Sequence, residues 1–158
     1  MKIEAGQKAP EFHLHDTDRK EVSLQDQQGK NTLLLFFPMA FTGVCTKELC
    51  SVRDNIAVYN SADAVVFGIS VDSPMTLAKF KEEQGLNFSL LSDFNKEAST
   101  AYGAIYDAFI GWMKGVSKRS AFVIDKEGIV RYAEVLENAG EQPNFEAIQK
   151  ILKELNQR

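Results

Sequence analysis

Residues 31–45 of the chain read NTLLLFFPMAFTGVC. The apolar run Asn31–Phe37 ends at Pro38, and such an uninterrupted run is typical of a central strand that is buried on both faces. From Thr42 to Tyr59 the apolar residues recur at helical spacing. We therefore expect a buried strand that leads through a short loop into a helix, which is a unit of an α/β sheet.

The segments on either side extend this pattern. Glu11–Asp16 and Lys20–Leu24 alternate polar and apolar residues around a short link, and they predict an N-terminal β-hairpin. The other predicted elements are a strand over 64–71, a helix over 73–84 that opens with Ser-Pro, a strand over 88–91, a short helix over 96–102, a hairpin of strands 120–125 and 129–135, and a closing amphipathic helix over 144–155. This order predicts an α/β fold with a central mixed β-sheet flanked by helices.

The segment 105–118 is the least clear part of the sequence. It holds Phe109, Ile110, Trp112 and Met113 together with glycines. Such a segment fits a lid, a loop packed on the core, or a surface for an oligomer. The sequence leaves these three interpretations open.

Length and composition are those of a single globular domain, which we place at residues 1–158. The net charge of −4 argues against nucleic acid or an anionic membrane as a partner. No apolar run approaches the roughly 20 residues that span a bilayer, and the N-terminus lacks the apolar region of a secretory signal. Two cysteines without such a signal indicate the reducing cytosol, so we expect a cytoplasmic protein whose cysteines are catalytic or metal-binding.

Cys45 lies where a thiol gains reactivity. It follows the apolar strand, and with Thr42 as a helix N-cap it falls at the third helical position. A helix N-terminus offers unpaired N–H groups and a positive dipole end, and both favour the thiolate. A buried structural cysteine is the alternative. Position alone leaves the two readings about equally supported.

Cys50 follows five residues later. In an intact helix this spacing separates the two Cα atoms by roughly 8–9 Å, whereas a disulfide needs about 7 Å or less. Cys50 is therefore a bystander, or its reaction with Cys45 requires local unwinding. The spacing is not that of a C-x-x-C pair, and a structural zinc site is not expected because His13 and His15 lie in the distant hairpin, where we predict a solvated face.

Two charged residues complete the candidate site. Glu48 lies one turn after Cys45 on roughly the same helix face, and alone it would disfavour a thiolate. Arg119 opens an apolar strand, from which a guanidinium can point into a pocket at the end of the sheet. A solvated helix face for Glu48 and a surface salt bridge for Arg119 are the alternatives.

These residues carry a resemblance. Pro38-x-x-x-Thr42-x-x-Cys45 matches the P-x-x-x-T/S-x-x-C signature of the peroxiredoxins (the AhpC/TSA family). The agreement covers nearly the whole chain, and it includes Ala9-Pro10-Glu11-Phe12, Val71-Asp72-Ser73, Arg119 and Phe122-Val123-Ile124-Asp125. The stretch Phe37–Cys45 resembles the one-cysteine, AhpE-like branch. Cys50 matches the resolving position of the bacterioferritin-comigratory (Q-type) branch.

The resemblance implies a thioredoxin-like fold and a thiol-dependent peroxidase that reduces hydrogen peroxide and organic hydroperoxides through a cysteine sulfenic acid. The implied roles are Cys45 as the peroxidatic cysteine, Pro38 as its shield from solvent, Thr42 as the hydroxyl that orients peroxide and thiolate, Arg119 as the activating cation, Glu48 as a hydrogen-bonding partner of arginine, and Cys50 as the resolving cysteine. A thioredoxin-like dithiol is the implied reductant, no metal, haem or flavin is implied, and a homodimer through loops near the site is a further expectation.

Two other functions remain open at the level of sequence. A thiol–disulfide oxidoreductase of the same fold is one, although the absence of C-x-x-C speaks against it. A non-enzymatic redox-sensing or binding module is the other. A purely structural domain would leave the spacing from Pro38 to Cys45 unexplained.

Overall fold

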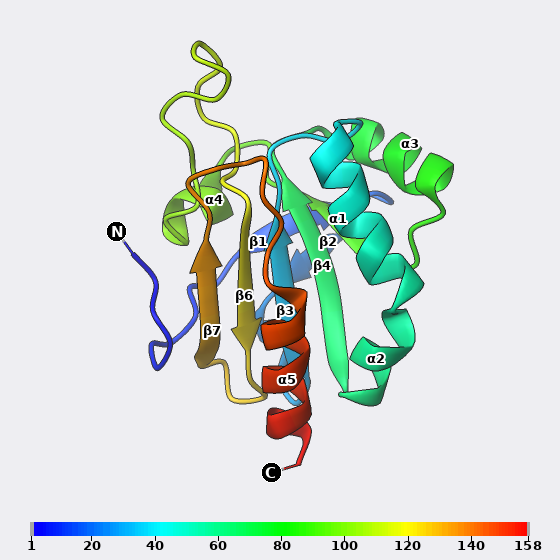
Figure 1. The fold of residues 1–158 in the computed structure, drawn as a ribbon, viewed down its shortest axis with the longest axis vertical. Helices are drawn as coiled ribbons and strands as arrows, with labels where there is room; N and C mark the ends of the chain where they lie inside the picture. Colours follow the sequence, from blue (N-terminus) through cyan, green and yellow to red (C-terminus); the bar gives the residue numbers. More distant parts are fainter. Residues whose placement is uncertain (1, 158) are drawn as a thin grey trace.

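The computed structural model describes residues 2–157, and in this range the strands form one mixed sheet in the order β2-β1-β5-β4-β3-β6-β7 (Figure 1). The elements are β1 (His13–Asp16), β2 (Glu21–Ser23), the 3₁₀ turn η1 (Gln25–Gln27), β3 (Asn31–Phe36), α1 (Gly43–Asp54), α2 (Ile56–Ser61), β4 (Ala64–Ser70), α3 (Pro74–Gln84), β5 (Ser89–Ser92), α4 (Glu97–Ala101), β6 (Ser120–Ile124), β7 (Val130–Val135) and α5 (Phe145–Asn156). The predicted α/β fold with a mixed sheet and an N-terminal hairpin is confirmed.

Strand β3 lies inside the sheet, parallel to β4 and antiparallel to β6, and its six residues are all buried. Alternate side chains face two separate cores, as the period of a strand requires. Leu33 and Leu35 pack in the core that α1, α2, α3 and α5 cover. Leu34 and Phe36 pack in the core that α4 and the N-terminal segment cover on the other face (Figure 1). The apolar run thus fills both faces of the sheet, which confirms the predicted central strand.

Helix α3 begins and ends where the sequence predicts. The Ser73 hydroxyl accepts a hydrogen bond from the Thr76 N–H at 3.1 Å, and Pro74 occupies the first turn, where its missing N–H costs nothing. Gly85 ends the helix in the left-handed conformation, which glycine adopts without strain. The helix therefore presents its first turn at the same edge of the sheet as the start of α1.

The predicted helix from Thr42 to Tyr59 is wrong in its continuity, because the structure divides it into α1 and α2 at Asn55. The side-chain amide of Asn55 donates to the Ser51 carbonyl at 2.8 Å. In a continuous helix that carbonyl would accept from the backbone N–H of Asn55. The side chain replaces the backbone donor, and asparagine is known for this competition.

Segment 105–118 forms a hairpin-like loop that projects from the end of the sheet (Figure 1). At its base Tyr106, Val116 and Ser117 are buried, whereas Ile110 and Trp112 at its tip are 68% and 74% exposed. The loop therefore packs on the core at its base and offers an apolar tip to the surroundings. Within residues 2–157 no helix is both long and apolar enough to cross a membrane.

Candidate active site

Cys45 lies at the third position of α1, the helix that follows β3 in the chain, as predicted. Its side chain is fully buried, and its thiol is free. Phe37 extends the pairing of β3 by donating its N–H to the Ile69 carbonyl at 2.9 Å, and Pro38, also buried, then ends the strand. The short loop that follows therefore carries the chain from the sheet edge into the first turn of α1.

Arg119 directly precedes β6, the strand next to β3. Each of the three nitrogen atoms of its guanidinium donates a hydrogen bond. Nη2 donates to Cys45 Sγ at 3.1 Å, and Nη1 donates to Glu48 Oε1 at 2.7 Å. Nε donates to the carbonyl of Ala139 at 2.8 Å. The side chain is only 2% exposed, so the surface salt bridge considered from sequence is wrong. The structure brings Cys45, Glu48 and Arg119 into one buried cluster.

Glu48 is fully buried, so the solvated helix face considered from sequence is also wrong. Burial raises the pKa of Glu48 to about 7, although the charge and the hydrogen bond of Arg119 act to lower it. Burial alone would lower the pKa of Arg119, but Glu48 and Cys45 raise it, so the guanidinium keeps its charge. Among residues 2–157 no group bonds to Glu48 Oε2. Glu48 therefore accepts the Arg119 hydrogen bond through Oε1 in surroundings that favour its protonated form.

Thr42 occupies the N-cap position of α1, but its side chain does not cap the helix. Its hydroxyl donates instead to the Met39 carbonyl at 2.8 Å, which closes the loop between Pro38 and the helix. Phe41 adopts a φ of 67°, a left-handed conformation that costs a non-glycine residue about 1 kcal/mol or more. The loop needs outside support to hold this shape.

Asp72 supplies that support, and sequence reasoning gave it no role. Its Oδ2 accepts the Ala40 N–H at 2.8 Å and the Ser70 hydroxyl at 2.7 Å. The Asp72 carbonyl in turn accepts the Ser92 hydroxyl at 2.6 Å. A polar residue directly after a buried strand is the available signal, because the carboxyl ends of parallel strands meet at one edge of a sheet.

Cys50 lies in the same continuous helix as Cys45, and both thiols are free. Its half-buried Sγ lies 3.6 Å from Gln84 Oε1. The helical spacing therefore keeps the two sulfurs on different faces of α1, as the sequence predicts. The structure brings Glu48 and Arg119 together with Cys45, and it places Pro38 and Thr42 in the loop that leads into α1. Cys50 lies outside this hydrogen-bonded group.

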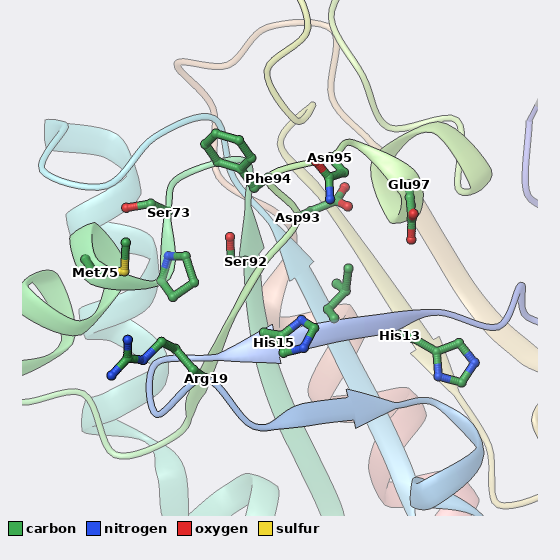
Figure 2. A pocket seen from close by; sticks show the side chains of 12 residues that line it. His13, His15, Arg19, Ser73, Met75, Ser92, Asp93, Phe94, Asn95 and Glu97 are labelled. Carbon is green, nitrogen blue, oxygen red and sulfur yellow. The ribbon is translucent and has the colours of Figure 1, made fainter.

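A separate cavity lies on another part of the molecule. Figure 2 shows this cavity of about 580 Å³ between the hairpin and the starts of α3 and α4. His13, His15 and Arg19 line one side, and Met75 and Phe94 line another. The two histidines are exposed, as predicted. Cys45 and Arg119 are not among its lining residues, so this cavity is separate from the thiol site.

The geometry defines a class of protein: an α/β thiol protein with a buried cysteine in the first turn of a helix, hydrogen-bonded by an arginine. The model of the AhpC/TSA family matches residues 5–133. The chain belongs to this family, the peroxiredoxins.

The relatives carry the names of both branches that the sequence resembles. The chain is 38% identical over 136 residues to alkyl hydroperoxide reductase E of Mycobacterium tuberculosis, which covers 84% of this chain and 86% of that protein. It is 37% identical over 131 residues to peroxiredoxin Bcp of Escherichia coli, which covers 82% and 84%.

Solved structures agree with the fold. A peroxiredoxin-like protein from Aquifex aeolicus matches with a TM-score of 0.89 and 26% identity, covering 98% of this chain and 89% of that chain. Peroxidoxin BcpB from M. tuberculosis matches with a TM-score of 0.85 and 27% identity, covering 97% and 98%. The predicted thioredoxin-like fold is confirmed.

Proposed function

We propose that this chain is a thiol-dependent peroxidase in which Cys45 attacks hydrogen peroxide or an organic hydroperoxide. Thiol-dependent peroxide reduction is the activity of the family to which the chain belongs. The assignment to Cys45 rests on one observation: the Arg119 guanidinium lies 3.1 Å from Cys45 Sγ in a buried site at the start of a helix. A cation and helix N–H groups beside a sulfur both favour the nucleophilic thiolate.

In the proposed reaction the Cys45 thiolate attacks one oxygen of the peroxide in line with the O–O bond. A sulfur–oxygen bond forms as the O–O bond breaks, so the sulfur loses two electrons and the peroxide gains them. The departing oxygen takes up a proton and leaves as water or an alcohol, and Cys45 becomes a sulfenic acid. Arg119 and the N–H groups of α1 stabilise the charge that moves from sulfur to oxygen.

We assign the other site residues from the family resemblance and from their positions in the structure. Pro38 is buried beside the loop and shields the thiol from bulk solvent. The Thr42 hydroxyl lies in the loop three residues before Cys45, where it can orient the bound peroxide. Glu48 holds Nη1 of Arg119, which leaves Nη2 directed at the sulfur.

The direct test compares two cysteine variants for consumption of the first equivalent of peroxide by the reduced protein, a reaction that precedes the resolving step. Cys45→Ser is expected to lose the catalysed reaction completely, because serine lacks a thiolate. Cys50→Ser is the matched control, since it makes the same change five residues away and leaves the first chemical step intact. Turnover by Cys45→Ser at the wild-type rate would overturn the proposal.

The second half of the cycle assigns Cys50 as the resolving cysteine. The sulfenic acid of Cys45 condenses with the Cys50 thiol, water leaves, and a disulfide forms. A thioredoxin-like dithiol then reduces this bond. Both cysteines lie in α1, so the condensation requires the first turns of that helix to unwind.

Mass spectrometry of peptides after one equivalent of hydrogen peroxide tests this step. A cross-linked peptide pair joining Cys45 and Cys50 is expected, with a loss of two hydrogen masses. Cys50→Ser should instead accumulate the sulfenic acid of Cys45, which a dimedone adduct reveals. A persistent sulfenic acid in the wild-type chain, with Cys50 still free, would show that the resolving thiol comes from another molecule.

We further propose that the chain is one domain that acts in the cytoplasm and forms a homodimer. Repeated reduction of Cys45 fits a reducing compartment. Three exposed large apolar side chains follow the carboxyl ends of the parallel strands β3, β4 and β5: Phe41, Met75 and Phe94. Two more, Ile110 and Trp112, lie at the tip of the loop that projects from the same edge of the sheet. An apolar patch of this kind fits a second copy of the chain.

A further inference from the structure

We infer that Tyr106 is a positioning residue for Arg119, acting through the backbone segment 136–139. The inference rests on the proposed role of Arg119 beside Cys45. It adds a residue of the projecting loop to the site, although Tyr106 has no hydrogen bond to Cys45 or Glu48 among the described residues.

Segment 136–139 follows β7 and holds Arg119 at two points. The Leu136 N–H donates to the backbone carbonyl of Arg119 at 2.9 Å. The carbonyl of Ala139 accepts from Arg119 Nε at 2.8 Å. The same short segment therefore fixes both the main chain and the guanidinium of Arg119, and a shift of the segment moves the nitrogen that faces the sulfur.

Tyr106 links this segment to the buried base of the projecting loop. Its hydroxyl donates to the Leu136 carbonyl at 2.8 Å, and its side chain is only 7% exposed. Burial raises the pKa of Tyr106, so the hydroxyl keeps its proton and remains a donor. The hydrogen bond from Tyr106 to Leu136 thus joins the base of the projecting loop to segment 136–139, which is hydrogen-bonded to Arg119.

Tyr106 is itself firmly placed at the base of the loop. Its N–H donates to the Val116 carbonyl at 2.9 Å, and its carbonyl accepts the Gly115 N–H at 3.1 Å. Its ring stacks on Phe109 with centroids 5.8 Å apart, and Lys118 Nζ lies 5.8 Å from the ring centroid. The hydroxyl therefore has a fixed direction, which a positioning residue requires.

The functional consequence follows from geometry. Charge stabilisation in a transition state depends on donors held in place before the reaction, and a displacement of about 1 Å can cost up to a hundredfold in rate. Loss of the Tyr106 hydroxyl leaves the Leu136 carbonyl without its donor and frees segment 136–139 to shift. We expect a fall of roughly tenfold in the rate constant for peroxide.

The test is a double-mutant cycle on the second-order rate constant of Cys45 with hydrogen peroxide. Tyr106→Phe keeps the ring and removes the hydroxyl. It is measured alone and combined with Arg119→Lys, which keeps the positive charge and removes the fork of donors. Tyr106→Phe alone is expected to lower the rate constant roughly tenfold, and in the Arg119→Lys background by less than about twofold.

Tyr102→Phe is the matched control. The Tyr102 hydroxyl also donates to a backbone carbonyl, that of Pro10 at 2.7 Å, and its side chain is fully buried in the core on the other side of the sheet. Tyr102→Phe removes the same kind of bond and is expected to leave the rate constant within about twofold in both backgrounds. Thermal melting of both variants measures any loss of stability separately.

The outcomes separate the inference from the proposed function. If Arg119→Lys alone leaves the rate constant unchanged, the proposed role of Arg119 fails and the role of Tyr106 fails with it. If Arg119→Lys is slow and Tyr106→Phe is as fast as wild type, only the inference is overturned. The inference is also overturned if Tyr106→Phe costs the same factor in both backgrounds, because the hydroxyl then acts independently of Arg119.

Discussion

Cys45 and Glu48 lie in α1, and Arg119 directly precedes β6. Their contacts support the proposal that the buried thiol is reactive. A charge buried alone would be strongly unfavourable, but the guanidinium lies within hydrogen-bonding distance of both the sulfur and the carboxylate. The positive charge of Arg119 offsets the cost of burying Cys45 and Glu48, two groups that can carry negative charge, and these groups in turn offset the cost of burying the guanidinium. Replacing only one member of such a cluster leaves an uncompensated charge, which typically costs about 3–5 kcal/mol.

The burial of Glu48 predicts a dependence of stability on pH. Burial raises the pKa of Glu48 from its ordinary value of 4.5 to about 7, so folding favours the protonated form. The contribution of Glu48 to the free energy of unfolding is therefore fully present below pH 4.5 and is lost as the pH rises through 7. The loss is on the order of 1–3 kcal/mol.

Urea unfolding of wild type and Glu48→Gln between pH 4 and pH 8 measures this loss, because glutamine keeps the size of the side chain and does not titrate. The free energy of unfolding of wild type relative to the variant is expected to fall with rising pH. A difference that stays constant or rises would contradict the assignment.

At the scale of elements, α1 has two conflicting tasks. Its first turn presents N–H groups to Cys45, which requires an intact helix. The proposed disulfide with Cys50 requires the same turns to open. The loop before α1 is held from outside, by Asp72 on Ala40, and not by a side-chain cap at Thr42. The helix start therefore lacks one of the bonds that would resist unwinding.

The contact between β4 and β5 gives a prediction for packing. A Cβ atom on Gly68 would lie 2.7 Å from Leu90 Cδ2 and 3.4 Å from Phe37 Cε1, in the core beneath the site. Gly68→Ala is therefore expected to lower the free energy of unfolding by about 1–3 kcal/mol, because the core must expand.

Urea unfolding with an unchanged m value measures the effect of Gly68→Ala. Gly43→Ala is the control, since nothing lies within 4 Å of a Cβ at that position in the first turn of α1. We expect Gly43→Ala to be neutral or to stabilise by up to about 1 kcal/mol. Equal effects of the two variants would show that the close approach at Gly68 is relieved without cost.

At the scale of the whole molecule, the elements that form the site meet at one edge of the sheet. β3 and β4 are parallel, so α1 and α3 both begin at their carboxyl edge, and β6, antiparallel to β3, brings Arg119 to the same edge (Figure 1). The projecting loop leaves from this edge as well. The thiol site and the segments that carry the exposed apolar side chains therefore lie toward the same edge of the sheet.

The exposed tip of the loop gives a prediction for assembly. Sedimentation equilibrium of the wild-type chain is expected to give twice the chain mass, because burial of Ile110 and Trp112 against a second copy removes apolar surface from water. Trp112→Glu is expected to shift the equilibrium to the monomer, since an unpaired charge would be buried in the interface.

Gln157→Glu adds the same charge at an exposed position directly after α5. Helix α5 ends at the opposite end of the molecule from the projecting loop, so this variant should leave the dimer intact (Figure 1). A monomeric wild type, or a dimer that persists in Trp112→Glu combined with Ile110→Glu, would rule out this surface.

Most elements could be predicted because each has a local cause. The run Asn31–Phe37 has no polar residue that could face water on either side of the sheet after Thr32, and Ser73-Pro74 fixes a helix start by capping. The break at Asn55 was missed, because a side chain that replaces its own backbone donor leaves no mark in the apolar spacing. Residue spacing alone could not give the cation beside Glu48, because Arg119 lies 71 residues away in the sequence, and only the family resemblance implied that pair.

The sequence by itself determined the strand and the helix around Cys45, the position of that thiol in the first turn, and the family signature from Pro38 to Cys45. These are local properties, set by side-chain spacing and backbone preference. Only the tertiary structure decided three contacts. Arg119 donates a hydrogen bond to the sulfur of Cys45, Asp72 accepts one from the loop before α1, and the Tyr106 hydroxyl donates one to segment 136–139. Each of these contacts joins residues far apart in the chain, and such a contact exists only after the sheet has brought β3, β4, β6 and β7 to a common edge.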